Sequence, residues 1–346
     1  MSGTGTRGPA HRSGAVYAGV DIGGTTTQVL LCTPGLAVLD RFETATPAGG
    51  PAMLDAVLGG LRGLLDRRPA RLLGVGVGAA GVVDARAGRV VAASDSFRDW
   101  AGFEVTATLE AALGVPAFLD NDVNAFLRGE VTGGAVAGEP DVLGMTLGTG
   151  VGGALWLGGA LLDGPHGAAG EIGHIPGFGA LPCSCGGRGH LETLAAGRSV
   201  AARYRERTGR SGTAREVAAA ARGGDAEARA VFEAAGTGIG RALLMTAGLV
   251  DVTTAVLGGG VTGAWDLLEP AIRRVLAEEP PVSGQPVRLV RAGLGGDAVA
   301  VGAASRARAE LARRPGASAQ ASGALREPVP DAGPASGAAG ACASGR

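Results

Sequence analysis

The sequence predicts an α/β fold built from two similar halves. Short β-rich runs alternate with helical patterns between residues 15 and 311, as in layered α/β proteins. A strand, a glycine turn and a second strand occur near the start of the chain and again near its middle. The chain of 346 residues is long enough for two domains with separate cores. Two halves imply an interdomain cleft, which is the usual place for a ligand.

The first half begins with three closely spaced strands. We predict them at Ala15–Val20, Gln28–Cys32 and Ala37–Glu43, with turns at Gly23-Gly24 and Pro34-Gly35. This spacing favours an antiparallel meander. A helix and two strands are predicted to follow at Ala52–Leu65, Leu72–Gly78 and Val115–Leu119. The order is typical of one half of an actin-like ATPase, a two-domain fold of the ribonuclease H-like type.

The second half repeats this arrangement in outline. Its predicted strands are Val142–Leu147, Gly152–Leu157, Ala160–Leu162, Thr254–Leu257 and Val287–Arg291. The helix predicted at Asp225–Val250 carries Phe232, Ile239 and Leu243 at helical spacing, which indicates packing against a core. We expect a small domain at residues 15–122, completed by a C-terminal helix at 297–311, and a larger domain at residues 123–296.

Composition indicates a small-molecule partner. Lys+Arg 31 against Asp+Glu 32 gives a net charge of -1, which provides no general attraction to nucleic acid or to an anionic membrane. The first residues contain no apolar signal segment, and no apolar run approaches the roughly 20 residues of a membrane span. The four cysteines form no evident disulfide framework, as in a reducing compartment. We therefore expect a cytoplasmic protein, with disordered tails at residues 1–14 and 312–346.

A glycine-rich loop between residues 174 and 192 contains four potential metal ligands. His174, Cys183, Cys185 and His190 could form a Cys2His2 zinc site, and a set without an open position is typical of structural zinc. Rigid carboxylates on either side could accept hydrogen bonds from a polyol, and these are Glu171 and Glu192. The alternative is that the His and Cys residues fell together by chance in an ordinary loop.

Three glycine loops follow strands and could bind phosphate through backbone N–H groups. The first contains Asp21, which could also hold Mg²⁺ through water. The candidate nucleotide-binding residues are Asp21, Gly23, Gly24, Thr25, Gly148, Thr149, Gly150, Gly152, Gly258, Gly259 and Gly260. Neither a Walker loop nor a G-x-G-x-x-G fingerprint is present, so ATP would be held by another scheme. The alternative for each loop is a simple turn.

Polar residues also gather where a strand ends before a predicted helix that begins near Asn124. Asp120, Asn121 and Asp122 occupy this junction. Asp122 is the candidate general base that would accept the proton of an attacking hydroxyl in phosphoryl transfer. The alternative is helix capping, which these residue types favour. A helix needs one capping residue, and three such polar residues exceed that number.

Together these motifs resemble the ROK group of bacterial sugar kinases, which shares the actin-like ATPase fold with hexokinases. The resemblance covers residues 15–311 and rests on DIGGT at 21–25, GVGAAGVVD at 76–84, DNDVNAFLRGE at 120–130, LGTGVGG at 147–153, GPHGAAGEIGH at 164–174, CSCGGRGHLE at 183–192 and LGGGV at 257–261. It implies an ATP-dependent and Mg²⁺-dependent hexose kinase with a structural zinc ion, assembled as a homo-oligomer. It implies that Asp122 is the base and that the sugar hydroxyls bind Asn121, Glu171, His174 and Glu192.

The chain departs from the family pattern in three places. His190 stands where the third cysteine of the metal loop is expected, Thr26 replaces a frequent lysine, and Ser96 is nearest to an asparagine that meets glucose. The expected substrate is the 6-hydroxyl of glucose; the alternatives are N-acetylmannosamine, N-acetylglucosamine or another hexose. A non-catalytic sugar sensor is a further alternative. A repressor is disfavoured because the 14 residues before the first strand are too few for a helix-turn-helix domain.

Overall fold

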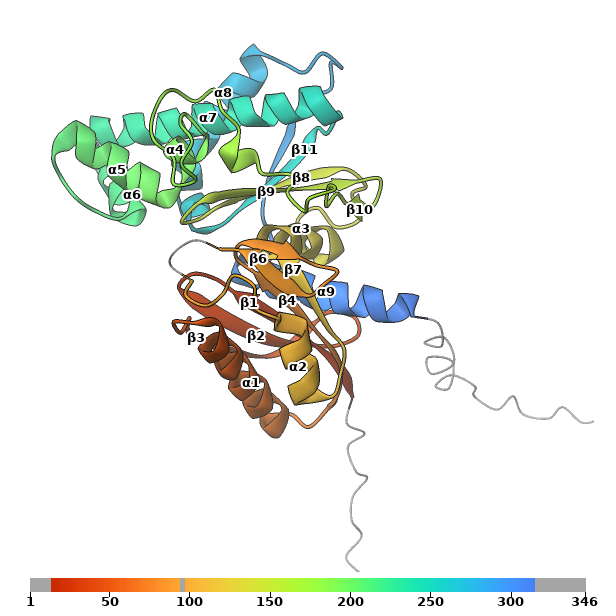
Figure 1. Ribbon diagram of the computed structural model, residues 1–346. Coiled ribbons are helices and arrows are strands. Elements are labelled where there is room, and N and C mark those ends of the chain that lie inside the picture. The colour runs from red at the N-terminus through yellow and green to blue at the C-terminus, as the bar shows by residue number, and fades with distance from the viewer. Residues whose placement is uncertain (1–13, 94–96, 315–346) are drawn as a thin grey trace, which may run out of the picture. The chain divides into compact units, whose positions relative to one another are not determined.

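A computed structural model describes residues 14–93 and 97–314, and two five-stranded sheets organise its core. The chain divides into a unit of residues Met1–Ala309 and a unit of Glu310–Arg346, of which the last helical residues are described. Figure 1 labels the elements along the chain. The division into domains at residues 122 and 123 stays a prediction.

The first sheet has the strand order β3-β2-β1-β4-β7. In chain order its strands are β1 (Ala15–Ile22), β2 (Thr26–Cys32), β3 (Val38–Ala45), β4 (Arg71–Ala79) and β7 (Ala117–Asn121). Strands β1, β2 and β3 pair antiparallel, as the predicted meander requires, whereas β4 and β7 add in parallel. The predicted strands of this half are confirmed, with bounds that shift by at most a few residues.

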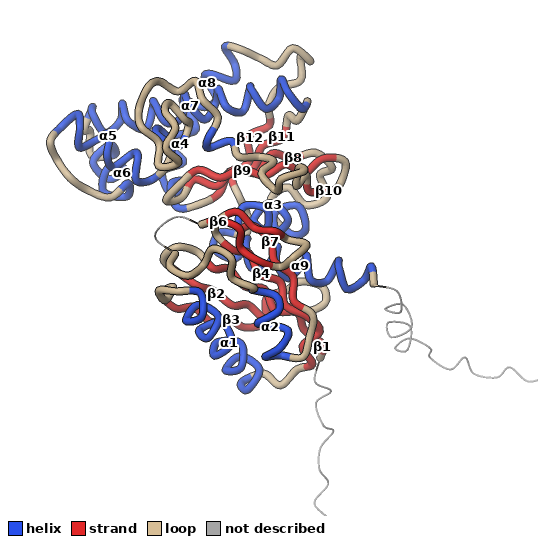
Figure 2. The backbone as a smooth tube through the Cα atoms, viewed as in Figure 1, coloured by secondary structure: helices blue, strands red, loops and turns tan. Residues whose placement is uncertain are grey.

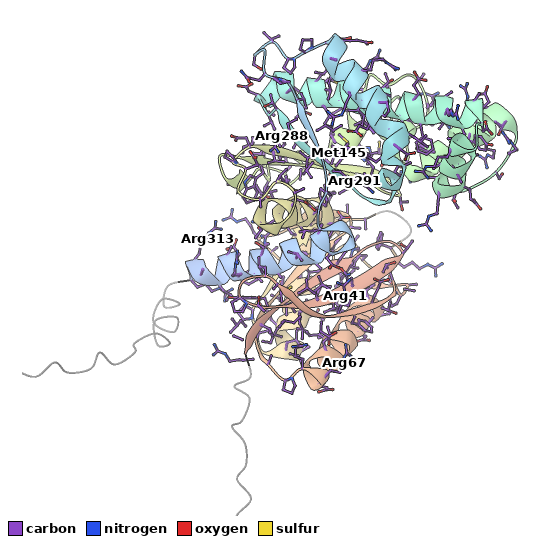
Figure 3. All side chains as sticks on the ribbon, turned by 180° about the vertical axis from the view of Figure 1, so that it is seen from behind. Arg41, Arg67, Met145, Arg288, Arg291 and Arg313 are labelled. Atoms are coloured by element: carbon purple, nitrogen blue, oxygen red, sulfur yellow. The ribbon has the colours of Figure 1, made fainter. Side chains whose placement is uncertain are left out.

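Helices cover both faces of the first sheet. The buried residues Met53, Leu54 and Val57 of α1 (Gly50–Arg67) pack in one cluster with Val20 of β1. Gly19 points to the opposite face because neighbouring strand residues alternate. A Cβ on Gly19 would collide with the backbone of Ala300, so helix α9 (Ala298–Arg313) lies directly on that face. Figure 3 shows α9 on the side turned toward the viewer. Helix α2 (Val105–Leu113) contacts β7.

The second sheet has the same order of strand types, β10-β9-β8-β11-β12. Its strands are β8 (Val142–Leu147), β9 (Val151–Leu157), β10 (Ala160–Leu161), β11 (Thr254–Gly258) and β12 (Arg288–Arg291). The first three pair antiparallel and the last two add in parallel, so the predicted repeat is confirmed. Met145, labelled in Figure 3, lies fully buried in β8.

Helices dominate the segment after β10, as Figure 2 shows in blue. They are α4 (Glu192–Ala195), α5 (Gly197–Thr208), α6 (Ala214–Arg222), α7 (Ala226–Val250) and α8 (Trp265–Glu278). Phe232, Ile239 and Leu243 of α7 are buried in the core of this half, as their spacing predicted. Short 3-10 turns occur at η1 (Ile172–His174), η2 (Gly260–Ala264) and η3 (Gly295–Asp297). A separate hairpin consists of β5 (Val82–Asp84) and β6 (Arg89–Ala92).

Helix α3 (Asp122–Gly133) connects the two sheets. It contacts β4 and β7 of the first sheet as well as β8 and β9 of the second. Gly129 and Gly302 let α3 and α9 approach closely, because a Cβ on Gly302 would collide with the carbonyl of Ala125. The buried carboxylate of Glu130 accepts the N–H groups of Ala135, Gly293 and Leu294 at 2.8–3.0 Å. These contacts fix the helix that begins at the candidate base.

Candidate active site

Asn121 caps the helix on which the candidate base lies. Its Oδ1 accepts the N–H groups of Val123 at 2.8 Å and Asn124 at 3.2 Å, while its Nδ2 donates to the Gly81 carbonyl at 2.9 Å. Helix α3 therefore begins at Asp122, two residues before the predicted start near Asn124. The side-chain oxygen satisfies N–H groups that the first turn leaves open. The capping interpretation thus accounts for Asn121.

Asp120 faces the protein interior and is 1% exposed. Its carboxylate lies 2.8 Å from a guanidinium nitrogen of Arg306 on α9 and 3.6 Å from Nε of Arg128 on α3. The guanidinium of Arg128 also lies 5.7 Å from the ring centre of Trp156 on β9. Buried ion pairs of this kind are costly to break because one charge would stay behind without compensation. Asp120 thus connects elements, and the capping interpretation does not apply to it.

Asp122 is the first residue of α3 and carries a carboxyl group with altered acidity. Burial, together with the negative charge of Glu171, raises the pKa of Asp122 to about 6. Burial and the charge of Asp122 raise the pKa of Asp21, at the end of β1, to about 7. Asp122 therefore interacts electrostatically with one acidic group from β1 and one from the segment before η1. A carboxyl group with a pKa near neutrality is well matched to proton transfer at physiological pH.

The first glycine loop forms the turn between β1 and β2. The N–H of Gly23 donates to the Thr26 carbonyl at 3.1 Å, and the hydroxyl of Thr46 donates to the Gly23 carbonyl at 2.7 Å. Gly24 and Thr25 are exposed at the tip. Within the described residues, no acceptor is found for the N–H groups of Gly24 and Thr25. These two donors are thus available to an anion.

The second and third loops lie beside each other. A Cβ on Gly259 would lie 2.6 Å from the Leu147 carbonyl, so only a glycine fits there. The N–H of Gly197 donates to the Gly148 carbonyl at 2.8 Å. In the part of the chain that the structure describes, the N–H groups of Thr149 and Gly150 find no acceptor. The segment around Gly259 therefore lies beside the strand end that leads into the loop at 148–150, and that loop offers these two N–H donors to an anion.

Two predicted nucleotide-binding glycines have clear packing roles. Gly152 lies within β9 opposite Thr146, and a Cβ there would collide with the side chain of Val123 on α3. Gly258 ends β11, and its Cβ would lie 2.5 Å from the ring of Phe126. Both glycines let α3 approach the second sheet.

The four predicted metal ligands come together. The ligand atoms of His174, Cys183, Cys185 and His190 all lie within 4.8 Å of one another. Cys183 Sγ lies 3.7 Å from Nδ1 of His174, and Cys185 Sγ lies 3.2 Å from Nδ1 of His190. In a tetrahedral site with ordinary zinc bond lengths, neighbouring ligand atoms are about 3.3–3.8 Å apart. The donor set therefore suits zinc, including the histidine at position 190, and these two pairs lie at or near that spacing.

Glu192, at the start of α4, has its carboxylate surrounded by protein donors. Oε2 accepts the Val151 N–H at 3.0 Å, and Oε1 accepts the Ser184 hydroxyl at 2.8 Å and the Arg198 guanidinium. Burial alone would raise the pKa of Glu192, but the Val151 N–H, Ser184 and Arg198 outweigh burial and hold it below its ordinary value. Ser184 and Arg198 were not predicted as site residues, because no motif distinguishes them.

The described residues bring Asp122 into electrostatic contact with Asp21 and with Glu171, and they bring Glu192 next to Cys183 of the metal cluster at 3.7 Å. Glu171 is exposed, whereas Glu192 is buried. Ser96, which replaces the expected asparagine, lies outside the described residues. No helix in the described ranges is both long and apolar enough to cross a membrane.

A model of the ROK family matches residues 17–310, and the chain belongs to this family. Glucokinase from Halalkalibacterium halodurans is 36% identical over 195 residues, which cover 54% of this chain and 58% of that relative. An N-acetylmannosamine kinase from Escherichia coli is 33% identical over 186 residues, which cover 53% of this chain and 62% of that relative. The chain thus spans less than two thirds of the length of these curated relatives.

Solved structures match over more of the chain. A crystal structure of a ROK family glucokinase from Streptomyces griseus, in complex with glucose and AMPPNP, is 31% identical. It aligns with a TM-score of 0.75 over 85% of this chain and 99% of that one. The predicted α/β fold of the actin-like ATPase type is thereby confirmed.

Proposed function

We propose that the protein is an ATP-dependent hexose kinase and that its substrate is glucose. The observation that carries the proposal is Asp122, a carboxyl group at a helix start with a pKa raised to about 6. The glucokinase relative and the solved glucokinase with glucose and an ATP analogue support the substrate class. Glycine loops with unpaired N–H donors support the use of a nucleotide.

In this reaction, the 6-hydroxyl oxygen of the sugar attacks the γ-phosphorus of ATP. A P–O bond forms to the sugar while the P–O bond to ADP breaks, and the carboxylate of Asp122 accepts the hydroxyl proton. Most of the rate enhancement in phosphoryl transfer comes from positioning and charge neutralisation, so a correctly oriented carboxylate suffices as base. The raised pKa of Asp21 indicates a carboxyl group whose negative charge lacks compensation, and this fits a bound cation. Mg²⁺ held there would neutralise phosphate charge.

The remaining roles extend this proposal. Sugar hydroxyls are assigned to Asn121, Glu171, His174 and Glu192. Phosphate groups are assigned to the glycine loops around Gly24, Thr149 and Gly259. Structural zinc is assigned to His174, Cys183, Cys185 and His190, whose spacing supports it. By family resemblance, we further propose a cytoplasmic dimer or tetramer.

Replacement of the candidate base tests the proposal. Asp122→Asn removes the proton acceptor and keeps the side-chain shape, so we expect turnover to fall at least about 100-fold. Sugar affinity, measured by calorimetry, should change little. Asp84→Asn is the matched control, because Asp84 lies in the β5–β6 hairpin and its carboxylate accepts the N–H groups of Arg86 and Ala87 in its own turn. Turnover of the Asp122 variant close to that of the wild type would remove Asp122 from this role.

N-acetylmannosamine is the second candidate substrate. A kinase for this sugar is 33% identical to the chain, only slightly less than the glucokinase. The ratio of kcat/KM for the two sugars decides between them, since discrimination depends on the difference in transition-state binding. A larger value for N-acetylmannosamine would assign the protein to that activity.

A further inference from the structure

Glu192 joins three segments that are far apart in the sequence or separated by loops. Its Oε2 holds the Val151 N–H, directly after the loop at 148–150. Its Oε1 holds Ser184 of the metal loop, and its backbone carbonyl accepts the Ser199 hydroxyl on α5 at 2.6 Å. One buried residue, Glu192, thus forms hydrogen bonds with the segment after the loop at 148–150, with the metal loop and with α5.

Gly150 shows how closely Glu192 approaches the glycine loop. A Cβ on Gly150 would lie 2.5 Å from Oε2 of Glu192, well inside contact distance. Oε2 of Glu192 therefore packs directly against the loop at 148–150, in the space that a side chain at position 150 would need.

Arg198 is the charged group that compensates Glu192. Its guanidinium donates to Oε1 of Glu192 and, at 2.6 Å, to the hydroxyl of Ser184. The carboxylate of Glu192 is 7% exposed, whereas the Arg198 side chain is 47% exposed. A buried carboxylate needs both hydrogen bonds and a compensating charge to stay in place. Both donations come from one guanidinium nitrogen, Nη2, so a single charged group holds the two acceptors together.

Arg203 offers a comparison on the same helix. It lines the same cavity of about 300 Å³ as Ser184, Glu192 and Arg198. Its guanidinium pairs with the exposed Glu206 at 2.6 Å instead of with Glu192. Both arginines therefore contribute charge to this cavity, and only Arg198 is bonded to the carboxylate that holds Val151.

We propose that Arg198 is a positioning residue. It fixes the carboxylate of Glu192 and thereby holds the loop at 148–150 in a fixed position relative to the metal loop. Its effect on turnover rests on the proposed function, whereas its effect on the loop does not. Loss of Arg198 leaves Glu192 without its compensating charge, so the Val151 N–H is released more often. The loop that would receive ATP phosphates then loses its fixed place.

Hydrogen exchange tests this proposal without reference to activity. Exchange is followed by mass spectrometry on peptides that span residues 148–156 in Arg198→Ala, Arg198→Lys and Arg203→Ala. We expect Arg198→Ala to exchange about 10-fold faster at these residues, because the local opening becomes easier. Arg198→Lys should recover most of the protection, and Arg203→Ala should match the wild type. Unchanged exchange in Arg198→Ala would overturn the proposal.

Kinetics and metal content separate a positioning role from a general structural one. With MgATP and sugar, kcat/KM of Arg198→Ala should fall about 10- to 100-fold, as expected of a displaced catalytic loop. In a Glu192→Gln background, Arg198→Ala should lower kcat/KM less than about threefold, because Arg198 acts through Glu192. Zinc content should equal that of the wild type; a loss of zinc would show that Arg198 acts on the metal loop and would overturn the proposal. Faster exchange in an Arg198→Ala variant, together with a wild type that is inactive on every sugar, would keep the positioning role and refute the kinase.

Discussion

At the scale of single residues, Asp122 combines a defined place with an unusual acidity. It begins α3, and burial raises its pKa from 3.8 to about 6. The folded protein therefore binds more protons than the unfolded chain between about pH 4 and pH 6, and stability falls as the pH rises through this window. Ionised Asp122 is consequently a source of instability at neutral pH.

Removal of this charge should stabilise the protein where the carboxyl group is ionised. We expect Asp122→Asn to raise the free energy of unfolding at pH 8 by about 1–2 kcal/mol, after allowance for solvent screening. The gain should shrink toward zero at pH 4, where the carboxyl group is protonated in the folded state. Urea denaturation at both values measures it.

Asp84 serves as the control with the opposite sign. Hydrogen bonds from the Ala87 and Arg86 N–H groups hold the pKa of Asp84 below its ordinary value, so its contribution to stability is present above that value. Asp84→Asn should therefore lose stability at pH 8. Equal gains for Asp122→Asn at pH 8 and pH 4 would contradict the assignment of a raised pKa.

Asp122 and the four potential metal ligands could be predicted as candidates because their chemistry is local and distinctive. The hydrogen-bond partners of Asn121 and Glu192 could not be predicted in this way. Asn121 donates to Gly81, and Glu192 accepts from Val151, partners that lie 40 and 41 residues away. Such contacts depend on the packing of separate elements, and a single sequence does not encode them as a pattern.

At the scale of elements, the metal loop is packed at its ends, where Phe178 and Leu191 are buried in the core, and it is exposed at residues 184–186. Cys183 donates its N–H to the Gly187 carbonyl at 2.9 Å, and the N–H of Gly189 donates to Leu181 at 2.8 Å. The exposed tip has these tight turns and the four potential metal ligands to order it. Binding of a structural zinc ion would supply that order as part of the folding free energy.

The metal prediction is tested on protein purified without chelator. We expect about one zinc ion per chain, and loss of it in His190→Ala, because four ligands complete a structural site. Hydrogen exchange at residues 174–192 should then increase. His166→Ala is the control, since His166 is exposed and stands outside the cluster. Wild-type protein that is fully ordered in this loop and contains no zinc would refute the site.

The contact between α3 and α9 depends on glycines. A Cβ on Gly302 would collide with the Ala125 carbonyl, so Gly302→Ala should destabilise the protein by about 1–3 kcal/mol. Gly59→Ala is the matched control on α1, where nothing lies within 4 Å of the new Cβ. That change should stabilise the helix by about 0.5–1 kcal/mol. Thermal unfolding measures the change in stability of both variants. Similar changes in Gly302→Ala and Gly59→Ala would contradict close packing at Gly302.

The strands and long helices were predictable because their apolar patterns are strong. Helix α7 follows its stripe, and Asp225 caps it by accepting the N–H groups of Glu227 and Ala228. The bounds of helix α8 were not predicted, and Pro270 inside it is a helix-breaking signal that tertiary packing overrides. The small hairpin of β5 and β6 was not predicted either, because its strands are too short to show a clear alternation of apolar and polar residues.

At the scale of the whole molecule, the repeated strand order is the feature that the sequence predicted best. Each sheet begins with an antiparallel meander and adds two parallel strands, so equivalent glycine turns occur at β1–β2 and β8–β9. Internal repetition makes this order visible in a single sequence. The choice of sugar is not visible in the same way, because it depends on a few side chains around the hydroxyl groups.

The proposed transfer of a phosphoryl group from ATP to a hexose can be measured as ADP release with MgATP and a panel of glucose, mannose, fructose, allose, N-acetylglucosamine and N-acetylmannosamine. We predict turnover, highest with glucose, which is lost in Asp122→Asn. No turnover with any of these sugars, from folded protein that contains zinc, would refute the proposed kinase activity.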